Sequence, residues 1–273
     1  QRLAIATSID AMDDYRDSLS QGTYTKNVCI RSFPGGGKTW CMTYCALYAV
    51  SKGLRVTTTA MMAKRALQIS GTNWHKLFIL PSENNLTPHR LKKLLIIKLL
   101  QSPKKLDFIK TINVILGNEM KQISAEMLAT FDIIFRRIRD SNLFLGGVLL
   151  IFTIDHNQIQ PIGGRPLLTS CHVLSSFKMV ALSNSARASG DPAFQLIQDI
   201  ARYTHRTFEE NPELIDEFVS LCSDNLTFVN DWDDDAIPAS TMRLYSKKFR
   251  LKMHPNSLLT ELGDKLRSVI DEK

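Results

Sequence analysis

The stretch SFPGGGKT, from Ser32 to Thr39, decides the fold of this chain. It follows the apolar run Val28–Ser32, which is expected to form a strand, and it opens the expected helix Lys38–Lys52. Glycines let the backbone turn its N–H groups toward a phosphate, and the helix N-terminus adds a favourable dipole. The plain alternative is a glycine-rich turn before an ordinary helix, but strand, loop and helix in this order favour a phosphate-binding loop.

The loop supplies the residues that are expected to bind a nucleotide and its metal ion. Lys38 is expected to reach the β- and γ-phosphates, and the hydroxyl of Thr39 is expected to bind Mg²⁺. The pattern usually begins with glycine, and Ser32 stands at that place. The whole expected nucleotide-binding set is Pro34, Gly35, Gly36, Gly37, Lys38 and Thr39.

Strand-like and helical runs alternate along the first two thirds of the chain. Several of the strand candidates are apolar nearly throughout, as strands buried on both faces of a parallel sheet should be. The pattern predicts a doubly wound α/β fold with a mainly parallel sheet. The further strand candidates are Arg55–Ala60, Ile112–Leu116, Val148–Ile154 and Met179–Leu182, and the further helices are Ala125–Arg139 and Pro192–Arg202, the latter with Asp191 as N-cap.

Two regions interrupt this alternation and define the expected domains. Residues 81–110 are basic and helical in character, and we interpret them as a candidate small insertion. After Leu182 the chain changes to helix and loop, so residues 1–182 are expected to form one domain and residues 183–273 the start of an incomplete second one. The first residue is not Met, which we interpret as a sign of a fragment or a processed product.

Composition narrows the class of protein. The net charge of +7 and the pI of about 9.2 favour a polyanionic partner, with a merely basic soluble protein as the equal alternative. No apolar run reaches the length that a bilayer requires, so no membrane partner is expected. The five cysteines show no zinc-ligand spacing, and we interpret them as small core residues in a reduced intracellular compartment.

Two further motifs follow buried strands. In VILGNEM, Glu119 stands where a carboxylate would polarise an attacking water, and Asn118 occupies the place of the Asp that helps to hold Mg²⁺. In TIDHNQIQPIGGRP, Gln158 is a candidate sensor of the γ-phosphate and Asp155 is expected to order the loop. Alone, the two motifs are more simply an exposed turn and a surface loop. Beside Lys38, they favour one site.

These motifs resemble the Pif/RecD-like, superfamily-one (1B) ATP-dependent DNA helicases. The resemblance covers roughly Val28 to Arg202 and lies in the order of the runs more than in any one of them. Three positions depart from it, because Ser32, Asn118 and Ile154 replace the usual residues. The runs, in chain order, are SFPGGGKT, TTTAMMAKRAL, SGTNWHKLF, NEMKQISAEML, TIDHNQIQPI and NSARASGDPAF.

The resemblance implies a RecA-like motor domain that hydrolyses ATP with Mg²⁺ and translocates on single-stranded DNA from 5′ to 3′. Residue by residue, it implies Glu119 as general base, Gln158 as γ-phosphate sensor and Arg187 as arginine finger. The partners implied are ATP and single-stranded DNA or its junction with a duplex, contacted by Thr59, Thr72 and His75. Work in DNA repair or recombination, in a nucleus or mitochondrion if the source is eukaryotic, is implied as well.

The departures sustain a second hypothesis. Asn118, Ser32 and the short second region favour a degenerate helicase-like protein that binds nucleotide or DNA but scarcely hydrolyses ATP. A P-loop kinase is a third hypothesis, which the ordered runs disfavour. No glutamine upstream of the loop was found to read adenine. Trp74 is expected in the core rather than on a base, and the stretch His89–Lys105 is expected to present a core face more than a DNA track.

Overall fold

The computed structural model describes residues 1–21, 26–80, 88–155, 157–158, 160–161, 163–182, 185–186, 189–203 and 205–225. The chain divides into two compact units, Gln1–Phe218 and Val219–Lys273, and almost everything described belongs to the first. No helix in the described part of the chain is long and apolar enough to cross a membrane.

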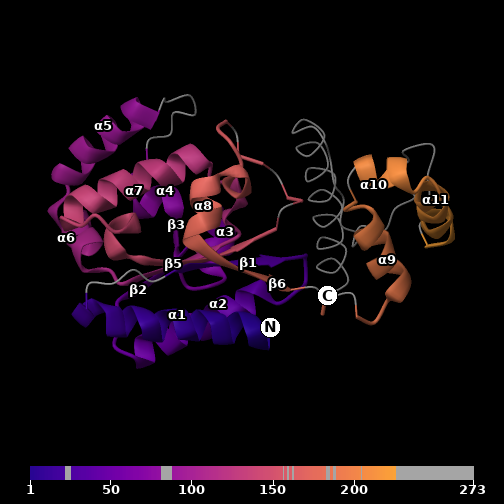
Figure 1. The fold of residues 1–273 in the computed structure, drawn as a ribbon, viewed down its shortest axis with the longest axis horizontal. Coiled ribbons are helices and arrows are strands. Elements are labelled where there is room, and N and C mark those ends of the chain that lie inside the picture. The colour runs from indigo at the N-terminus through magenta and orange to yellow at the C-terminus, as the bar shows by residue number, and fades with distance from the viewer. Residues whose placement is uncertain are drawn as a thin grey trace, which may run out of the picture. The chain divides into compact units, whose positions relative to one another are not determined.

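A six-stranded parallel sheet forms the centre of the first unit, in the order β3-β2-β4-β5-β1-β6 (Figure 1). Every residue of β4 and β5 is buried, because helices cover both faces of the sheet. This confirms the predicted α/β fold. The strands are β1 (Asn27–Ser32), β2 (Val56–Ala60), β3 (Thr72–Asn73), β4 (Val114–Asn118), β5 (Leu149–Ile154) and β6 (Phe177–Leu182).

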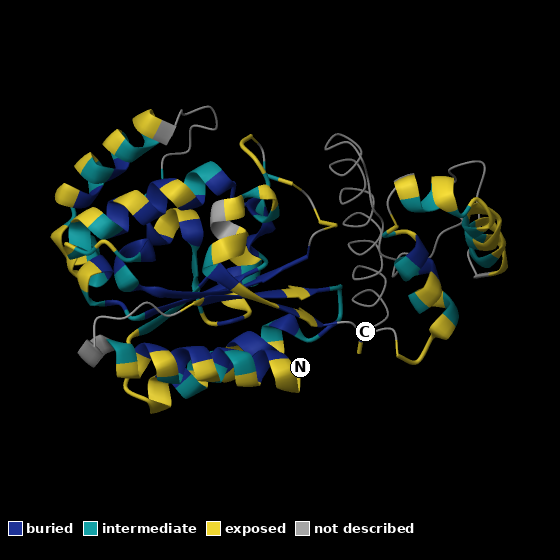
Figure 2. Cartoon of the chain, in the orientation of Figure 1, coloured by how far each residue is buried: buried dark blue, intermediate teal, exposed yellow. Residues whose placement is uncertain are grey.

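Helices pack on both faces of the sheet (Figure 1), and Figure 2 shows the sheet buried between them. Helices α1 (Arg2–Gln21) and α2 (Lys38–Ser51) cover one face. The other carries α4 (Trp74–Leu77), α5 (Pro88–Leu100), α7 (Ala125–Arg139) and α8 (Cys171–Ser176). The remaining helices are α3 (Ala63–Leu67), α6 (Pro103–Thr111), η1 (Met120–Gln122), η2 (Phe144–Gly147), η3 (Leu167–Thr169), α9 (Pro192–Ile200), α10 (His205–Glu210) and α11 (Glu213–Asn225).

Aromatic side chains fill the core between the sheet and α7. The Trp74 ring is 2% exposed and lies 4.5 Å from the Phe78 ring and 5.1 Å from the Phe131 ring, measured between centroids. Edge-to-face contacts at such distances add to the gain from burial. Trp74 is therefore a core residue, as expected. Leu95 and Leu99 of α5 are buried in the same core, which confirms the core face predicted for the basic stretch.

The elements that were predicted agree with the structure apart from their ends. Strand β4 begins at Val114 rather than Ile112, because Ile112 still closes the end of α6. Asp191 caps α9 as predicted, since its carboxylate accepts a hydrogen bond from the Phe194 N–H at 2.9 Å. The prediction missed α1 and the two-residue strand β3.

The prediction for the cysteines needs one correction. Cys29, Cys41 and Cys45 are fully buried in the core, as expected, but Cys171 is exposed and Cys222 is half-buried. Cys171 is the first residue of the short helix α8, and at this position its side chain faces solvent rather than the core. The start of a second motor domain at residue 183 stays a prediction.

Candidate nucleotide and nucleic-acid site

The loop between β1 and α2 has the backbone that a phosphate-binding loop requires. Gly35 and Gly37 adopt positive φ angles of 77° and 87°, and the Gly36 N–H donates to the Phe33 carbonyl at 3.2 Å. Only glycine adopts such angles without strain. Ser32 does not have a positive φ angle, so a side chain at this position causes no backbone strain. Its hydroxyl donates to the Phe33 carbonyl at 3.0 Å. The departure at Ser32 is therefore compatible with the loop.

Lys38 lies folded against this loop and is 7% exposed. Its Nζ donates to the carbonyl oxygens of Ser32 at 3.2 Å and Phe33 at 2.9 Å. Burial lowers the pKa of Lys38, and the nearby carboxylates of Asp155 and Glu119 oppose that change. The ammonium therefore bonds to the end of β1 and its loop, and it lies within the electrostatic reach of the carboxylates that follow β4 and β5.

Asn118, at the end of β4, is fully buried, with its amide oxygen facing Thr153. Its Oδ1 accepts a hydrogen bond from the Thr153 hydroxyl at 2.9 Å, and that hydroxyl oxygen accepts the Glu119 N–H at 3.0 Å. The Nδ2 group has no partner among the described residues. A buried donor thus stands where Asp would place an acceptor.

Glu119 follows directly and has a left-handed backbone, with φ 53° and ψ 54°. This conformation is uncommon for residues other than glycine, and such residues gather at functional sites. Its carboxylate is 17% exposed and forms an ion pair with Arg65 of α3, with 2.9 Å between Oε2 and Nε. The structure therefore brings α3 and the end of β4 together at this residue.

Asp155, at the end of β5, organises the third motif. It is 1% exposed, and its carboxylate accepts the Asn157 N–H at 3.2 Å and the amide of Gln158 at 3.4 Å. It also forms an ion pair with Arg202, whose guanidinium lies 4.4 Å from the centroid of the Phe33 ring. Asp155 therefore orders its loop, as expected, and ties it to Arg202 and the phosphate loop.

The three residues predicted to contact nucleic acid differ in exposure. Thr59 is fully buried, and its hydroxyl donates to the Thr72 carbonyl at 2.7 Å, which supports the pairing of β2 with β3. Thr72 is half-buried and His75 is exposed. Asn73 caps α4 by accepting the His75 N–H at 2.9 Å. Thr72 and His75 therefore present surface, whereas the buried Thr59 side chain does not, which argues against a direct contact of Thr59 with nucleic acid.

Arg187 lies outside the described residues, but the chain just before it contacts the phosphate loop. The Ser185 hydroxyl donates to the Pro34 carbonyl at 3.0 Å, and the Ala186 N–H donates to the Gly35 carbonyl at 3.0 Å. The segment after β6 is thus held against the loop.

Several residues of this site escaped the sequence reasoning. Gln1 is the clearest, because its Nε2 donates to the Gly36 carbonyl at 3.2 Å. Arg65 and Thr153 stand inside the helicase-like motifs of the sequence, so their position is a usable signal. Gln1 and Arg202 reach the loop through the tertiary fold, which the sequence pattern does not display.

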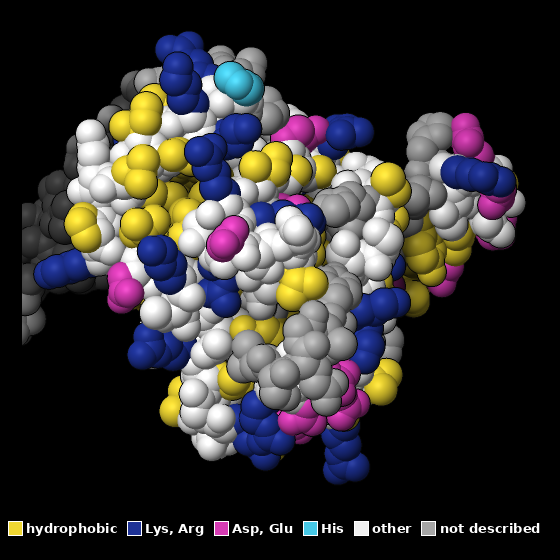
Figure 3. All heavy atoms as spheres, turned by 60° about the vertical axis from the view of Figure 1, so that its left-hand side comes forward, with side chains coloured by type: hydrophobic (Ala, Val, Ile, Leu, Met, Phe, Trp, Pro, Cys, Tyr) yellow, Lys and Arg dark blue, Asp and Glu magenta, His cyan; other side chains and the backbone are white. Residues whose placement is uncertain are grey.

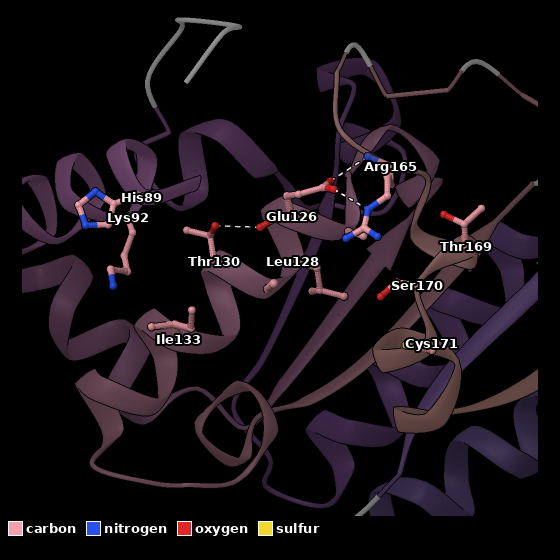
Figure 4. A pocket seen from close by; sticks show the side chains of 12 residues that line it. His89, Lys92, Glu126, Leu128, Thr130, Ile133, Arg165, Thr169, Ser170 and Cys171 are labelled. Atoms are coloured by element: carbon pink, nitrogen blue, oxygen red, sulfur yellow. Dashed lines mark hydrogen bonds and ion pairs between the residues drawn. The ribbon is translucent and has the colours of Figure 1, made fainter. Parts of the chain in front are cut away.

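A separate pocket of about 620 Å³ lies between α5, α7 and the segment that leads into α8 (Figure 4). Arg165 and Glu126 face one another across its rim, with Nε 2.9 Å from Oε1. No phosphate-loop residue lines it, so it is distinct from the nucleotide site. On the side that carries α5 and α6, Figure 3 shows Lys and Arg side chains spread among hydrophobic ones rather than gathered in one patch.

Comparisons with known proteins agree with this geometry. The family model described as "PIF1-like helicase" matches residues 14–209. No curated protein matches the sequence. Among solved structures, the Pif1 helicase from Candida albicans matches with a TM-score of 0.66 and 16% identity, over 92% of this chain and 54% of that one.

Two Bacteroides structures show the same fold. Bacteroides Pif1 bound to ssDNA has a TM-score of 0.51 and 19% identity, over 71% of this chain and 46% of that one. Bacteroides sp. Pif1 in complex with ADP-AlF4 has a TM-score of 0.53 and 19% identity, over 76% of this chain and 47% of that one. This chain spans about half the length of the three structures.

Proposed function

This chain belongs to the PIF1-like helicase family, and we propose that it is an ATP-hydrolysing motor that binds single-stranded DNA and moves along it from 5′ to 3′. The observation that carries the proposal is the buried Lys38, held on a glycine-rich loop beside the carboxylates of Glu119 and Asp155. These groups come from three adjacent strands, and ligands bind at the carboxyl edge of such a sheet.

The nucleotide phosphates fit the loop. The left-handed Gly35 and Gly37 turn the backbone, and a side chain at Gly37 would be strained by the positive φ angle. Lys38 would exchange its bonds to loop carbonyls for bonds to the β- and γ-phosphates.

The fit for Mg²⁺ is incomplete. Thr39 opens α2 and would offer its hydroxyl. Asn118 has one neutral oxygen, which already accepts the Thr153 hydroxyl, and it offers no negative charge. Within the described residues, no cluster of three or more His, Cys, Asp or Glu could hold a metal ion. Thr39 and the phosphates would therefore hold the ion with little help from β4.

Hydrolysis would divide its tasks among the remaining motif residues. Glu119 would accept a proton from the attacking water. Gln158, held beside Asp155, would contact the γ-phosphate. Arg187 is the proposed arginine finger that stabilises charge on the transferred phosphoryl group. It lies outside the described residues.

Single-stranded DNA is the proposed track. The net charge of +7 favours a polyanion, and Thr72 and His75 present surface next to the buried Thr59. The Bacteroides relatives were solved with ssDNA and with ADP-AlF4, which supports both ligands for this chain.

The test is ATP binding and phosphate release, with and without single-stranded DNA. Lys38→Ala should abolish nucleotide binding while the far-ultraviolet circular dichroism stays that of the parent. Lys52→Ala, which removes a positive charge just past the other end of α2, is the matched control and should bind ATP as the parent does. Equal ATP affinity in the parent and Lys38→Ala would refute the phosphate-loop assignment.

The second candidate is a degenerate helicase-like protein that binds nucleotide or DNA with little hydrolysis. The buried amide donor of Asn118 is the observation that favours it. ATP binding that depends on Lys38, together with no phosphate release even on DNA, would establish this candidate over the active motor.

A further inference from the structure

The Glu119 carboxylate is already engaged in this structure. Arg65 Nε lies 2.9 Å from its Oε2, and a second nitrogen of the same guanidinium, Nη1, donates to Gln68 Oε1 at 3.2 Å. The Glu119 N–H is held by Thr153 at 3.0 Å, so backbone and side chain are both restrained. Arg65 therefore holds one carboxylate oxygen of the proposed general base.

This contact competes with catalysis. A general base needs an oxygen within hydrogen-bond reach of the proton that it removes from water. The oxygen that accepts a charge-assisted hydrogen bond from the guanidinium is a weaker base than a free carboxylate oxygen. We therefore expect Glu119 to be more active when Arg65 binds another partner.

Arg65 is placed to find one. Its side chain is 42% exposed, whereas that of Glu119 is 17% exposed. It lies on α3, which connects β2 to β3 and packs on both. Thr72 of β3 and His75 of α4, the proposed DNA contacts, follow α3 along the chain. A guanidinium that is open to solvent binds phosphate oxygens in two-pronged geometry, so a DNA phosphate is a chemically suitable competitor.

We propose that Arg65 alternates between two anions, the Glu119 carboxylate in the DNA-free protein and a backbone phosphate of bound single-stranded DNA. The proposal rests on the proposed function and adds a physical connection between DNA binding and ATP hydrolysis. DNA binding would release Glu119 for catalysis. Because binding equilibria are reciprocal, loss of the Glu119 charge would in turn strengthen DNA binding.

The first test measures DNA affinity and needs no hydrolysis. Fluorescence anisotropy with a labelled oligonucleotide, without nucleotide, compares the parent, Glu119→Gln, Arg65→Ala and the double variant. Glu119→Gln should raise affinity about two- to five-fold, the scale of an exposed ion pair, and the gain should vanish when Arg65 is Ala. Equal gains in both backgrounds, or no gain in either, would overturn the proposal.

The second test measures phosphate release. Arg65→Ala should raise the DNA-free rate about two- to five-fold and reduce the stimulation by DNA. Lys64→Ala, which removes a charge from the same helix, should leave the stimulation ratio unchanged, and Arg65→Lys should retain part of it. A fall of both rates in Arg65→Ala would show that Arg65 only positions Glu119, and unchanged rates would show that the pair is idle.

The two tests separate this proposal from the function on which it rests. A chain in which no variant binds DNA would overturn the DNA track and the Arg65 exchange together. DNA binding with equal gains from Glu119→Gln in both backgrounds would overturn the exchange alone. If the chain binds DNA but releases no phosphate, Glu119→Gln should still raise DNA affinity in the parent and not in the Arg65→Ala background.

Discussion

Asp155 and Arg202 form an ion pair across 47 positions of the chain. The carboxylate is 1% exposed and the guanidinium 14% exposed, so neither group can exchange its partner for bulk water. The guanidinium also covers the ring of Phe33 in the phosphate loop. Arg202, which follows α9, therefore contacts both the end of β5 and the loop after β1.

Arg202→Ala should destabilise the protein by about 3 kcal/mol, because it leaves a buried carboxylate without its cation. The measurement is urea unfolding followed by circular dichroism. Arg206→Ala is the control, since its pair with Glu210 is 84% and 58% exposed and should contribute about 0.5 kcal/mol or less. Similar losses in the two variants would mean that the Asp155 pair is solvated in solution.

Asn118→Asp should raise Mg²⁺-dependent ATP hydrolysis by about 10- to 100-fold, the usual effect of a partner in the outer shell of a metal. The substitution would replace the orphaned Nδ2 donor by an acceptor and leave the bond from Thr153 in place. Steady-state phosphate release across a Mg²⁺ titration measures it, and adding Glu119→Gln should remove the gain. If Asn118→Asp binds ATP but gains no activity, the chain is limited elsewhere and the degenerate binder becomes the better description.

Binding of single-stranded DNA should weaken steeply with salt, with a slope of about −0.7 in log affinity against log salt for each phosphate neutralised. His75→Ala should lower the affinity and leave the slope unchanged at pH 8, where a surface imidazole is neutral. Lys76→Ala removes a neighbouring charge and should reduce the slope if that charge meets a phosphate. A flat salt response of the parent would count against a DNA track.

The buried thiols should make the protein less stable at alkaline pH. Burial raises the pKa of Cys29 from 9.0 to about 12 and that of Cys45 from 9.0 to about 11. Above pH 9 the unfolded chain ionises these thiols while the folded protein keeps them neutral, so the free energy of unfolding falls as pH rises toward 11.

The urea midpoint between pH 8 and pH 11 measures this fall, which should be shallower in Cys45→Ala than in the parent. Labelling at pH 8 gives an independent check, because the exposed Cys171 should react at once and Cys29 only after unfolding. Rapid labelling of Cys29 in the folded protein would contradict the assigned core.

Sequence patterns predicted the parts of this fold that rest on local composition. Strands such as β4 and β5 are apolar nearly throughout because both of their faces are covered, and the phosphate loop is recognised by its glycines. Strand β3 has two residues and no periodicity to detect. It pairs in parallel with β2, and the Thr59 hydroxyl supports this pairing by donating to the Thr72 carbonyl.

The candidate site was predictable residue by residue but not in its contacts. Glu119 and Asp155 directly follow β4 and β5, and Lys38 opens the helix after the β1 loop, so a parallel sheet brings all three to the same edge. The partners of the carboxylates come from α3 and from the turn after α9, so no spacing rule joins Arg65 to Glu119 or Arg202 to Asp155. Such pairs depend on packing, which a single sequence does not record.

Two hydrogen bonds, from Ser185 and Ala186, attach the chain after β6 to the phosphate loop. A rotation of the Pro34 and Gly35 carbonyls would break these bonds or displace residues 185 and 186. Binding or loss of a ligand in the loop is therefore expected to change the position of the chain where it leaves β6. The rigidity of the chain at this point is then expected to depend on what the loop binds.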